Sequence, residues 1–351
     1  MSAAAASDDL VRAALRTVFA GADLSREATE ELFGRLMDGT LSDVVKAALL
    51  GALAAKGESA DEIAGAASAM RRRALRIEHD VAEVVDTCGT GGDGKGTFNI
   101  STAAALVAAA AGVPIAKHGN RSVSSRSGSA DMLEALGVSI ETVPANAAAQ
   151  LAELSIAFLF APRLHPAMAE VMPVRKELAV RTIFNVLGPL TNPAGARRQV
   201  MGVYAPELVE TIGRVQAELG AEHALVVHGA DGLDEITTTG VTHVAEVRRD
   251  DEGTARVALR TLEPEDLGVE RAAPDALRGG TPADNAAAFE RLIDGQAGPL
   301  LEITVANAGA AIYVGGRAPS LLDGVATARD AVASGAVRDL VERLRAAPEP
   351  S

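Results

Sequence analysis

The sequence predicts an α/β protein with a small, discontinuous all-helical domain and a large α/β domain with a mostly parallel central sheet and flanking helices. Three observations lead to this prediction. Residues 7–76 show only helical periodicity, strand-length apolar segments alternate with helices from residue 81, and helical periodicity returns at 172–187. Strands that alternate with helices form parallel sheets. The interruption predicts that 172–187 packs back on the N-terminal helices.

These observations also give domain boundaries. The small helical domain is predicted to cover residues 1–78 and 171–192. The large α/β domain is predicted to cover 79–170 and 193–346, and residues 347–351 form a tail.

The N-terminal helices are predicted from capping residues. Ser7, Ser25 and Ser42 each precede an apolar-periodic segment and are predicted N-caps. Ser59 and Glu62 have the spacing of a capping box, in which each side chain bonds to the backbone N–H of the other residue. The sequence therefore predicts four helices before the first strand.

The α/β part is predicted from apolar segments of strand length between helical segments. Strands are predicted at 81–85, 113–116, 138–140, 156–160, 200–204, 223–228 and 311–314, with further strands in 242–268 on one side of the sheet. Helices are predicted at 99–112, 131–136, 145–154, 207–219, 283–295 and 319–346. Their alternation makes most of the sheet parallel.

Composition and charge exclude several classes of protein. The 351 residues carry a formal net charge of -14, which argues against non-specific nucleic-acid binding, because that binding depends on neutralising phosphates. No apolar segment is long enough to span a membrane, and the N-terminus has no signal-peptide pattern. A single cysteine, Cys88, cannot form an intramolecular disulfide. We expect a reduced, cytoplasmic protein.

Residues 81–130 stand out within this acidic chain. No acidic residue lies between Gly94 and Ala130, whereas Lys95, Lys117 and two arginines are positively charged. A glycine-rich loop exposes backbone N–H groups, and cations beside it concentrate positive potential. This segment is therefore predicted to bind a small polyanion.

The glycine loop also matches two nucleotide-binding patterns. Residues 89–94 fit G-x-G-x-x-G, but the acidic residue expected about 20 residues later is missing before Asp131. Gly94 and Lys95 fit part of a phosphate-binding P-loop, but Gly96 occupies the position of the magnesium-binding Ser or Thr. Neither nucleotide site is favoured. A phosphate cradle at a helix N-terminus and a purely structural turn remain open.

Polar residues follow the glycine loop at two further places. Asn99 and Ser101 begin a predicted helix, so they either cap it or supply donors to a phosphate and, for Ser101, a cation ligand. Residues 117–120 (KHGN) follow an apolar strand, where ligands of parallel sheets gather. The serines of 122–129, with Arg121 and Arg126, either form a flexible loop or wrap anionic oxygens.

The sequence also offers candidates for a metal and a second substrate. Asp234 and Glu235 lie in a Gly-rich loop after a predicted strand, and adjacent carboxylates bind magnesium well beside a phosphate. An ordinary solvated acidic turn is the alternative. Arg175 could hold a carboxylate with two hydrogen bonds or could lie on the surface.

Taken together, these residues resemble the anthranilate phosphoribosyltransferase family of tryptophan biosynthesis. The motifs that carry the resemblance are DTCGTGGDGKGTFNIST (86–102), KHGNRSVSSRSGSADMLEALG (117–137), FLFAP with HPAM (158–168), VRKEL with RTIFNVLGPLTNPA (174–194) and DGLDEI (231–236). Several motifs in the same order are more specific than any one of them. The resemblance covers nearly the whole chain.

The resemblance implies the second step of tryptophan synthesis from chorismate. In that reaction the phosphoribosyl group of phosphoribosyl pyrophosphate (PRPP) passes to the amine of anthranilate, which gives N-(5-phosphoribosyl)anthranilate and pyrophosphate. It also implies Mg²⁺ as cofactor, PRPP and anthranilate as small-molecule substrates, and a homodimer formed through the helical domain.

The resemblance also assigns site residues. Those implied for PRPP are Gly89, Gly92, Asp93, Thr97, Asn99, Ser101, Thr102, Lys117, His118, Gly119, Asn120, Arg121, Ser122, Val123, Ser124, Ser125 and Ser129. Those implied for anthranilate are Gly89, His118, Asn120, His165 and Arg175. Those implied for the metal are Ser101, Asp234 and Glu235. No residue is assigned as a general base, because an aromatic amine is already a nucleophile.

The chain departs from the family pattern at two places. Ala179 replaces the usual Gly, and we expect a tolerated change within a helix. Leu164 stands where an aromatic residue is common, so Leu164 and Met168 are expected to line the acceptor pocket.

Two other functions compete with this interpretation. A pyrimidine nucleoside phosphorylase would share the architecture, but KHGNR and DGLDE are not expected in it. A relative that binds nucleic acid would need a basic surface, whereas this chain is acidic outside the pocket region.

Overall fold

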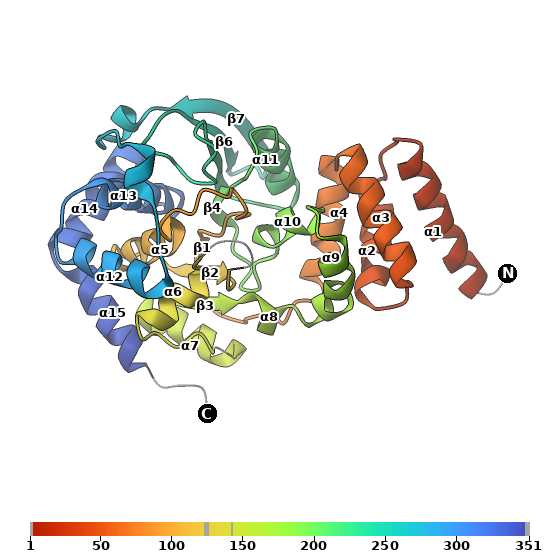
Figure 1. Cartoon of the computed structure of the whole chain (residues 1–351), viewed down its shortest axis with the longest axis horizontal. Helices are drawn as coiled ribbons and strands as arrows, with labels where there is room; N and C mark the ends of the chain where they lie inside the picture. The colour runs from red at the N-terminus through yellow and green to blue at the C-terminus, as the bar shows by residue number, and fades with distance from the viewer. Residues whose placement is uncertain (1–2, 123–125, 142, 348–351) are drawn as a thin grey trace. The chain divides into compact units, whose positions relative to one another are not determined.

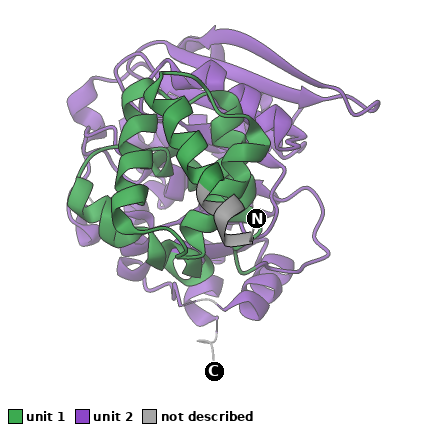
Figure 2. Ribbon diagram, turned by 90° about the vertical axis from the view of Figure 1, so that its right-hand side faces the viewer, with its two compact units in different colours: residues 1–75, 162–191 green, residues 76–161, 192–351 purple. Residues whose placement is uncertain are grey.

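The structure is a computed structural model that describes residues 3–122, 126–141 and 143–347, with side chains from residue 9 (Figure 1). The chain forms two compact units (Figure 2). Unit 1 consists of residues 1–75 and 162–191, and unit 2 consists of 76–161 and 192–351. The described helices include none that is long and apolar enough to cross a membrane.

The first segment of unit 1 is helical, as predicted. Its helices are α1 (Ala3–Phe19), α2 (Arg26–Met37), α3 (Asp43–Lys56) and α4 (Ala60–Arg71). Ser25 and Ser42 cap α2 and α3, and Ser59 and Glu62 form the predicted capping box of α4. The predicted N-cap at Ser7 is wrong, because α1 begins four residues earlier, at Ala3.

The second segment of unit 1 contains short helices. They are α8 (Ala161–Leu164), the 3₁₀ turn η1 (Pro166–Glu170), α9 (Met172–Leu178), α10 (Phe184–Leu187) and the 3₁₀ turn η2 (Pro189–Thr191). The sequence assigned 162–170 to the α/β domain, whereas the structure places them in unit 1. Their backbone explains the difference. Leu75 N–H donates to Leu164 O at 2.9 Å, and the Lys46 ammonium, on a buried side chain, donates to Glu170 O at 2.7 Å.

Unit 2 is built on a seven-stranded sheet with the order β3-β2-β1-β4-β5-β6-β7. The strands are β1 (Val85–Asp86), β2 (Ile115–Gly119), β3 (Ile156–Phe160), β4 (Arg198–Gly202), β5 (His223–Gly229), β6 (Thr242–Arg249) and β7 (Ala255–Leu262). β1 to β5 pair in parallel, and β6 and β7 add an antiparallel edge. This sheet and the helices of unit 1 confirm the predicted fold class.

The helices of unit 2 pack on the sheet and on one another. They are α5 (Ile100–Ala110), α6 (Ser129–Ala135), α7 (Pro144–Leu154), α11 (Leu208–Glu218), α12 (Pro282–Ile293), α13 (Pro299–Val314), α14 (Leu321–Ala333) and α15 (Ala336–Ala346), with 3₁₀ turns η3 (Pro264–Leu267) and η4 (Pro274–Leu277). α5 and α13 pack on each other, α5 on β2 and α13 on β4 and β5, whereas α11 packs on β5, β6 and β7 (Figure 1). The alanine-rich α5 is buried along nearly its whole length, which places the core between α5, α13 and the sheet.

Two predicted strands are wrong. Residues 138–140 are irregular, because Val138 N–H bonds to Leu133 O and closes the turn after α6. Residues 311–314 lie in α13, whose small residues let helices approach closely. An added Cβ at Gly309 would lie 2.6 Å from the Val325 backbone nitrogen, so α14 packs directly against α13 there. An apolar segment of strand length does not distinguish a buried strand from a buried helix.

Candidate functional site

Lys117, near the carboxyl end of β2, is the centre of the candidate site. Its side chain is 3% exposed. The ammonium lies 3.4 Å from Thr87 O, 3.3 Å from Thr87 Oγ1 and 3.4 Å from Ser101 Oγ. The structure therefore brings the loop after β1 and the first turn of α5 to the same cation, as expected where parallel strands end.

The glycine loop after β1 folds against the ends of β4 and β5. Thr90 N–H donates to Gly202 O at 2.9 Å, and Gly91 N–H donates to Asp234 Oδ2 at 2.7 Å. A Cβ at Gly202 would lie 1.5 Å from Asp234 O, and one at Gly89 would lie 3.0 Å from Gly202 O. Only glycine fits at 202, so this residue lets the acidic loop lie against the glycine loop.

Three carboxylates gather beside this loop. Asp234 and Glu235 are half-buried, and Asp93 comes close enough to raise the pKa of both. Burial, followed by the charge of Asp93, raises the pKa of Asp234 to about 7. Burial and Asp234 raise the pKa of Glu235 well above its ordinary value, although Lys117 and the Ser101 backbone N–H oppose this. Crowded carboxylates of this kind are stabilised by a cation.

The residues therefore fit Mg²⁺. Carboxylate oxygens are the ligands that this ion prefers, and the raised pKa values show negative charge that the protein only partly offsets. Ser101 lies at the same place, because its backbone N–H bonds to Glu235 and its hydroxyl contacts Lys117.

Asn99 precedes α5, but its side chain does not cap the helix. Its Nδ2 donates to Ser127 O at 3.1 Å, and its Oδ1 accepts from Ser127 Oγ at 2.9 Å and from Asn285 Nδ2 at 2.7 Å. Asn285, in α12, also accepts from Gly280 N–H at 2.8 Å. Of the two interpretations that the sequence left open, helix capping by the Asn99 side chain is therefore excluded, and Asn99 joins the glycine loop to the serine-rich loop.

The segment after Lys117 is held by α6. Asn120 N–H donates to Ser129 Oγ at 3.1 Å, and an added Cβ at Gly119 would lie 2.3 Å from the same oxygen. Arg121 pairs with Asp131 at 3.0 Å and with Glu134 at 2.5 Å. Its positive charge is therefore paired with carboxylates of α6.

The remaining predicted residues of this segment divide into two groups. His118 is buried, and Ser122 N–H donates to Asp131 Oδ2 at 3.1 Å. Val123, Ser124 and Ser125 lie outside the described residues.

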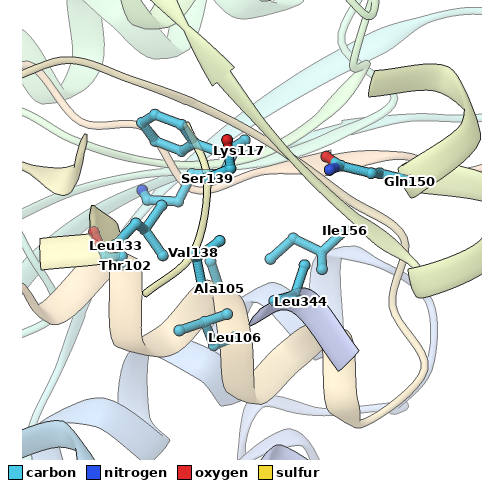
Figure 3. Close-up of a pocket in the computed structure, with 11 residues that line it drawn as sticks. Thr102, Ala105, Leu106, Lys117, Leu133, Val138, Ser139, Gln150, Ile156 and Leu344 are labelled. Carbon is cyan, nitrogen blue, oxygen red and sulfur yellow. The ribbon is translucent and has the colours of Figure 1, made fainter. Parts of the chain in front are cut away.

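Thr97 and Thr102 flank the start of α5. Thr97 forms a bridge with Arg278, and Phe98 N–H donates to Leu277 O at 3.0 Å. Thr102 is buried and lines a small cavity that Lys117 also borders (Figure 3). The remaining lining is mostly apolar: Ala105, Leu106, Leu133, Val138, Ser139, Gln150, Ile156, Phe158 and Leu344. An apolar interior cavity does not suit a polyanion, so the candidate site lies on the polar side of Lys117.

Arg175 and His165 belong to unit 1. Arg175 is half-buried in α9 and lies over the Phe184 ring at 5.4 Å, and burial lowers its pKa. His165 is buried, and burial lowers its pKa to about 4, so the imidazole is neutral at pH 7. Of the residues expected around the acceptor, Leu164 is buried and Met168 is half-buried in the same unit.

Ala179 corrects a prediction about this unit. It does not lie within a helix but ends α9, with φ 50° and ψ 28°. This left-handed conformation favours glycine, the residue that the family resemblance leads one to expect here. The substitution therefore places a side chain where the backbone disfavours one.

Two residues of the site were missed from the sequence. Gly202 is part of an ordinary strand pattern, so nothing local indicated its contact with Asp234. Asn285 lies 186 residues from its partner Asn99, and one asparagine in an amphipathic helix gives no signal.

Comparisons with known proteins agree with this geometry. The glycosyl transferase family, a/b domain, matches residues 81–338, and the glycosyl transferase family, helical bundle domain, matches residues 12–74. An anthranilate phosphoribosyltransferase of Thermomicrobium roseum is 50% identical over 337 residues, which are 96% of each chain. One of an Anaeromyxobacter species is 51% identical over 338 residues, which are 96% of this chain and 98% of that one.

The chain belongs to the anthranilate phosphoribosyltransferase family. Solved structures of this family share the fold. The enzyme from Thermus thermophilus has a TM-score of 0.88 and 47% identity, covering 95% of this chain and 98% of that one. The enzyme from Saccharomyces cerevisiae in complex with PRPP and Mg has a TM-score of 0.85 and 26% identity, and the match covers 95% of this chain and 96% of that one. The family resemblance seen in the sequence is confirmed.

Proposed function

We propose that this protein is an Mg²⁺-dependent phosphoribosyltransferase that transfers the phosphoribosyl group of PRPP to the amine of anthranilate. One observation supports the proposal best. Lys117, the first turn of α5 and the carboxylates Asp234 and Glu235 lie close together at one end of the sheet. A sugar pyrophosphate with a divalent cation needs this combination of positive and negative groups. Relatives of about 50% identity carry this activity in their names.

We further propose how the site residues divide between the ligands. PRPP contacts the glycine loop, the start of α5 and the segment after Lys117, through the residues named for it above. Ser101, Asp234 and Glu235 hold Mg²⁺, and Asp93 contributes negative charge beside them. Arg175 binds the anthranilate carboxylate, since its guanidinium can donate two parallel hydrogen bonds. The family resemblance also assigns Gly89, His118, Asn120 and His165 to anthranilate.

The chemistry follows from these positions. The lone pair of the anthranilate amine forms a bond to ribose C1, while the C1–O bond breaks and its electron pair leaves with pyrophosphate. The positively charged nitrogen that results then releases one proton to water, which gives the neutral secondary amine. Lys117 and the backbone N–H groups at the start of α5 stabilise the charge that develops on the leaving group. Bound Mg²⁺ supplies further neutralisation of that charge. The protein therefore acts by positioning and electrostatics, and no residue is assigned as a general base.

A fluorescence assay tests this function directly. Loss of anthranilate fluorescence is followed with PRPP and MgCl₂ present, and each component is then omitted in turn. Turnover that needs all three components supports the proposal. Turnover without PRPP, or with phosphate and a nucleoside in its place, contradicts it.

We also propose a homodimer formed through unit 1 and a cytoplasmic location. Phe19 in α1 and Val44 in α3 support the dimer, because their apolar side chains are 67% and 80% exposed and α1 packs against α3. Light scattering with Phe19→Ser and Val44→Ser variants tests it, and a mass equal to one chain for the unaltered protein would contradict it.

A further inference from the structure

Asp86 is a buried carboxylate that the proposed chemistry does not use. It ends β1, and its side chain is 1% exposed. Its Oδ1 accepts from Cys88 N–H at 3.0 Å and from His118 N–H at 3.1 Å, and its Oδ2 accepts from Asn192 Nδ2 at 2.7 Å. A buried carboxylate is expensive unless it has such partners, so its presence here calls for a reason.

The donors show what this carboxylate connects. β1 and β2 pair only at Val85 and Ile115, so the ladder ends one residue before Asp86. Beyond this point the Asp86 side chain takes the place of backbone pairing. It bonds to the first part of the glycine loop through Cys88 and to the segment after Lys117 through His118. Both loops belong to the proposed PRPP site.

Asn192 completes the connection. Its Nδ2 also donates to Ala116 O at 2.8 Å, and its Oδ1 accepts from Ala194 N–H at 2.9 Å. The asparagine therefore fixes the Asp86 carboxylate relative to β2. All donors to this carboxylate are N–H groups, so a neutral amide at position 86 could not accept from all of them.

A metal site is the competing explanation, because ligand atoms of Asp86, Cys88 and His118 lie within 4.8 Å of one another. The local chemistry disfavours it. Both Asp86 oxygens already accept hydrogen bonds. Burial, with the charge of Asp86, raises the pKa of the Cys88 thiol, whereas metal binding needs the thiolate.

We infer that Asp86, held by Asn192, is a positioning residue that fixes the two PRPP-binding loops at the ends of β1 and β2. The inference rests on the proposed function, because it assumes that these loops bind PRPP. Asp86 itself touches neither substrate. Its removal is expected to weaken PRPP binding while the fold persists.

The geometry suggests a substitution and its rescue. In Asp86→Asn, the amide oxygen can still accept from Cys88 and His118, but the amide nitrogen then faces Asn192 Nδ2, so two donors oppose each other. Adding Asn192→Asp provides an acceptor for that nitrogen. The double variant loses the bond to Ala116 O, so its rescue is expected to be partial.

Calorimetry of PRPP binding with MgCl₂ tests the inference without anthranilate. We expect Asp86→Asn to raise the Kd for PRPP at least about tenfold. The Kd of the double variant is expected to be at least about threefold lower than that of Asp86→Asn. Glu246→Gln is the matched control, because Glu246 is another carboxylate of unit 2 with only 12% of its side chain exposed, and it contacts neither loop. It is expected to bind PRPP like the unaltered protein.

The outcomes separate the two proposals. An unchanged Kd in Asp86→Asn, or an equal loss in Glu246→Gln, overturns the positioning role. If the unaltered protein does not bind PRPP, the proposed function falls and the inference falls with it. If Asp86→Asn does not fold, Asn192→Ala replaces it. This variant is expected to raise the Kd at least about threefold, and an unchanged Kd overturns the inference.

Discussion

Two groups of carboxylates in unit 2 differ in how the protein treats their charge. At the strand ends, burial and mutual repulsion raise the pKa values of Asp234 and Glu235. In β6, burial would also raise the pKa of Glu246, but hydrogen bonds from His223, Arg248 and Tyr313 lower it to about 2. Asp234 and Glu235 have too few cations of the protein beside them to offset their charge, whereas Glu246 has several.

The difference teaches how to recognise a functional site. Glu246 joins β5, β6, β7 and α13 through its partners, so its favourable electrostatics stabilise the sheet. Asp234 and Glu235 are held in an unfavourable arrangement that a bound cation would relieve. Carboxylates whose raised pKa values are only partly offset by protein groups are typical of sites that bind a ligand.

The largest expected effect comes from neutralising the first group. The double variant Asp234→Asn, Glu235→Gln is expected to lower Mg²⁺-dependent turnover by about a thousandfold or more, because it removes the charges that hold the cation. Steady-state kinetics over a range of MgCl₂ concentrations measures this. Glu246→Gln is the control and should keep kcat/KM within about twofold. Equal losses in both variants would contradict the comparison.

The same double variant should be more stable without metal. The pKa of Asp234 is raised in the folded protein, so its protonated form contributes to stability. This contribution is fully present below pH 3.8, the ordinary pKa, and is lost as the pH rises through about 7. At pH 8 without Mg²⁺, removal of the charges is therefore expected to raise Tm, as measured by calorimetry. A lower Tm would mean that the two carboxylates are structural.

The next effect is on stability and comes from Glu246. Because its pKa is lowered, the ionised Glu246 side chain stabilises the fold fully above pH 4.5, the ordinary pKa of this group. This stabilisation is lost as the pH falls towards about 2, the pKa in the folded protein. Glu246→Gln is expected to lower the free energy of unfolding at pH 7 by about 2–3 kcal/mol, and the difference should disappear near pH 2. Urea denaturation at several pH values measures this. A difference that does not depend on pH would contradict the charge-based explanation.

A smaller effect is expected from Asn285, which bonds the loops of the site rather than its charges. Asn285→Ala leaves Asn99 Oδ1 with one donor fewer and removes the acceptor of Gly280 N–H. The KM for PRPP is expected to rise about tenfold, because a lost buried hydrogen bond costs about 1–3 kcal/mol. Thr304→Val is the control, because Thr304 in α13 is buried like Asn285. An unchanged KM for PRPP would show that Asn99 is held well enough by Ser127.

Much of this arrangement could be predicted from the sequence. The strand Ile156–Phe160 has the predicted bounds, because a run of apolar and aromatic residues follows a clear helix end. Lys117, Asp234 and Glu235 were predicted as site residues because ligands of parallel sheets gather where strands end, and the structure brings the three side chains together. Both predictions depend on local patterns.

The rest depended on contacts between distant segments. Asn285 bonds to Asn99 only because η4 and α12 pass beside the glycine loop. Arg121 lies in a segment predicted to bind an anion, and nothing local indicated that its guanidinium reaches Asp131 and Glu134 in α6. Residues 311–314 look like a strand locally, but they end α13, a helix that packs against α5, α14 and the sheet.

The smallest expected effect concerns an unfavourable backbone conformation rather than unfavourable charges. Ala179 is a second unfavourable feature near a proposed substrate residue, because its left-handed conformation follows the helix that carries Arg175. Ala179→Gly is expected to raise the free energy of unfolding by about 0.5–1 kcal/mol, since glycine avoids the steric cost but loses more chain entropy on folding. Ser155→Gly is the matched control, because Ser155 ends α7 with φ 58°.

Comparison of the two variants by calorimetry and kinetics shows whether the conformation at Ala179 matters only for stability. Both variants should gain similar stability, and the KM for anthranilate should change by less than about twofold in each. A higher KM in Ala179→Gly alone would mean that the alanine restricts the position of Arg175. In that case the unfavourable backbone, like the crowded carboxylates, would belong to the substrate site rather than to the scaffold.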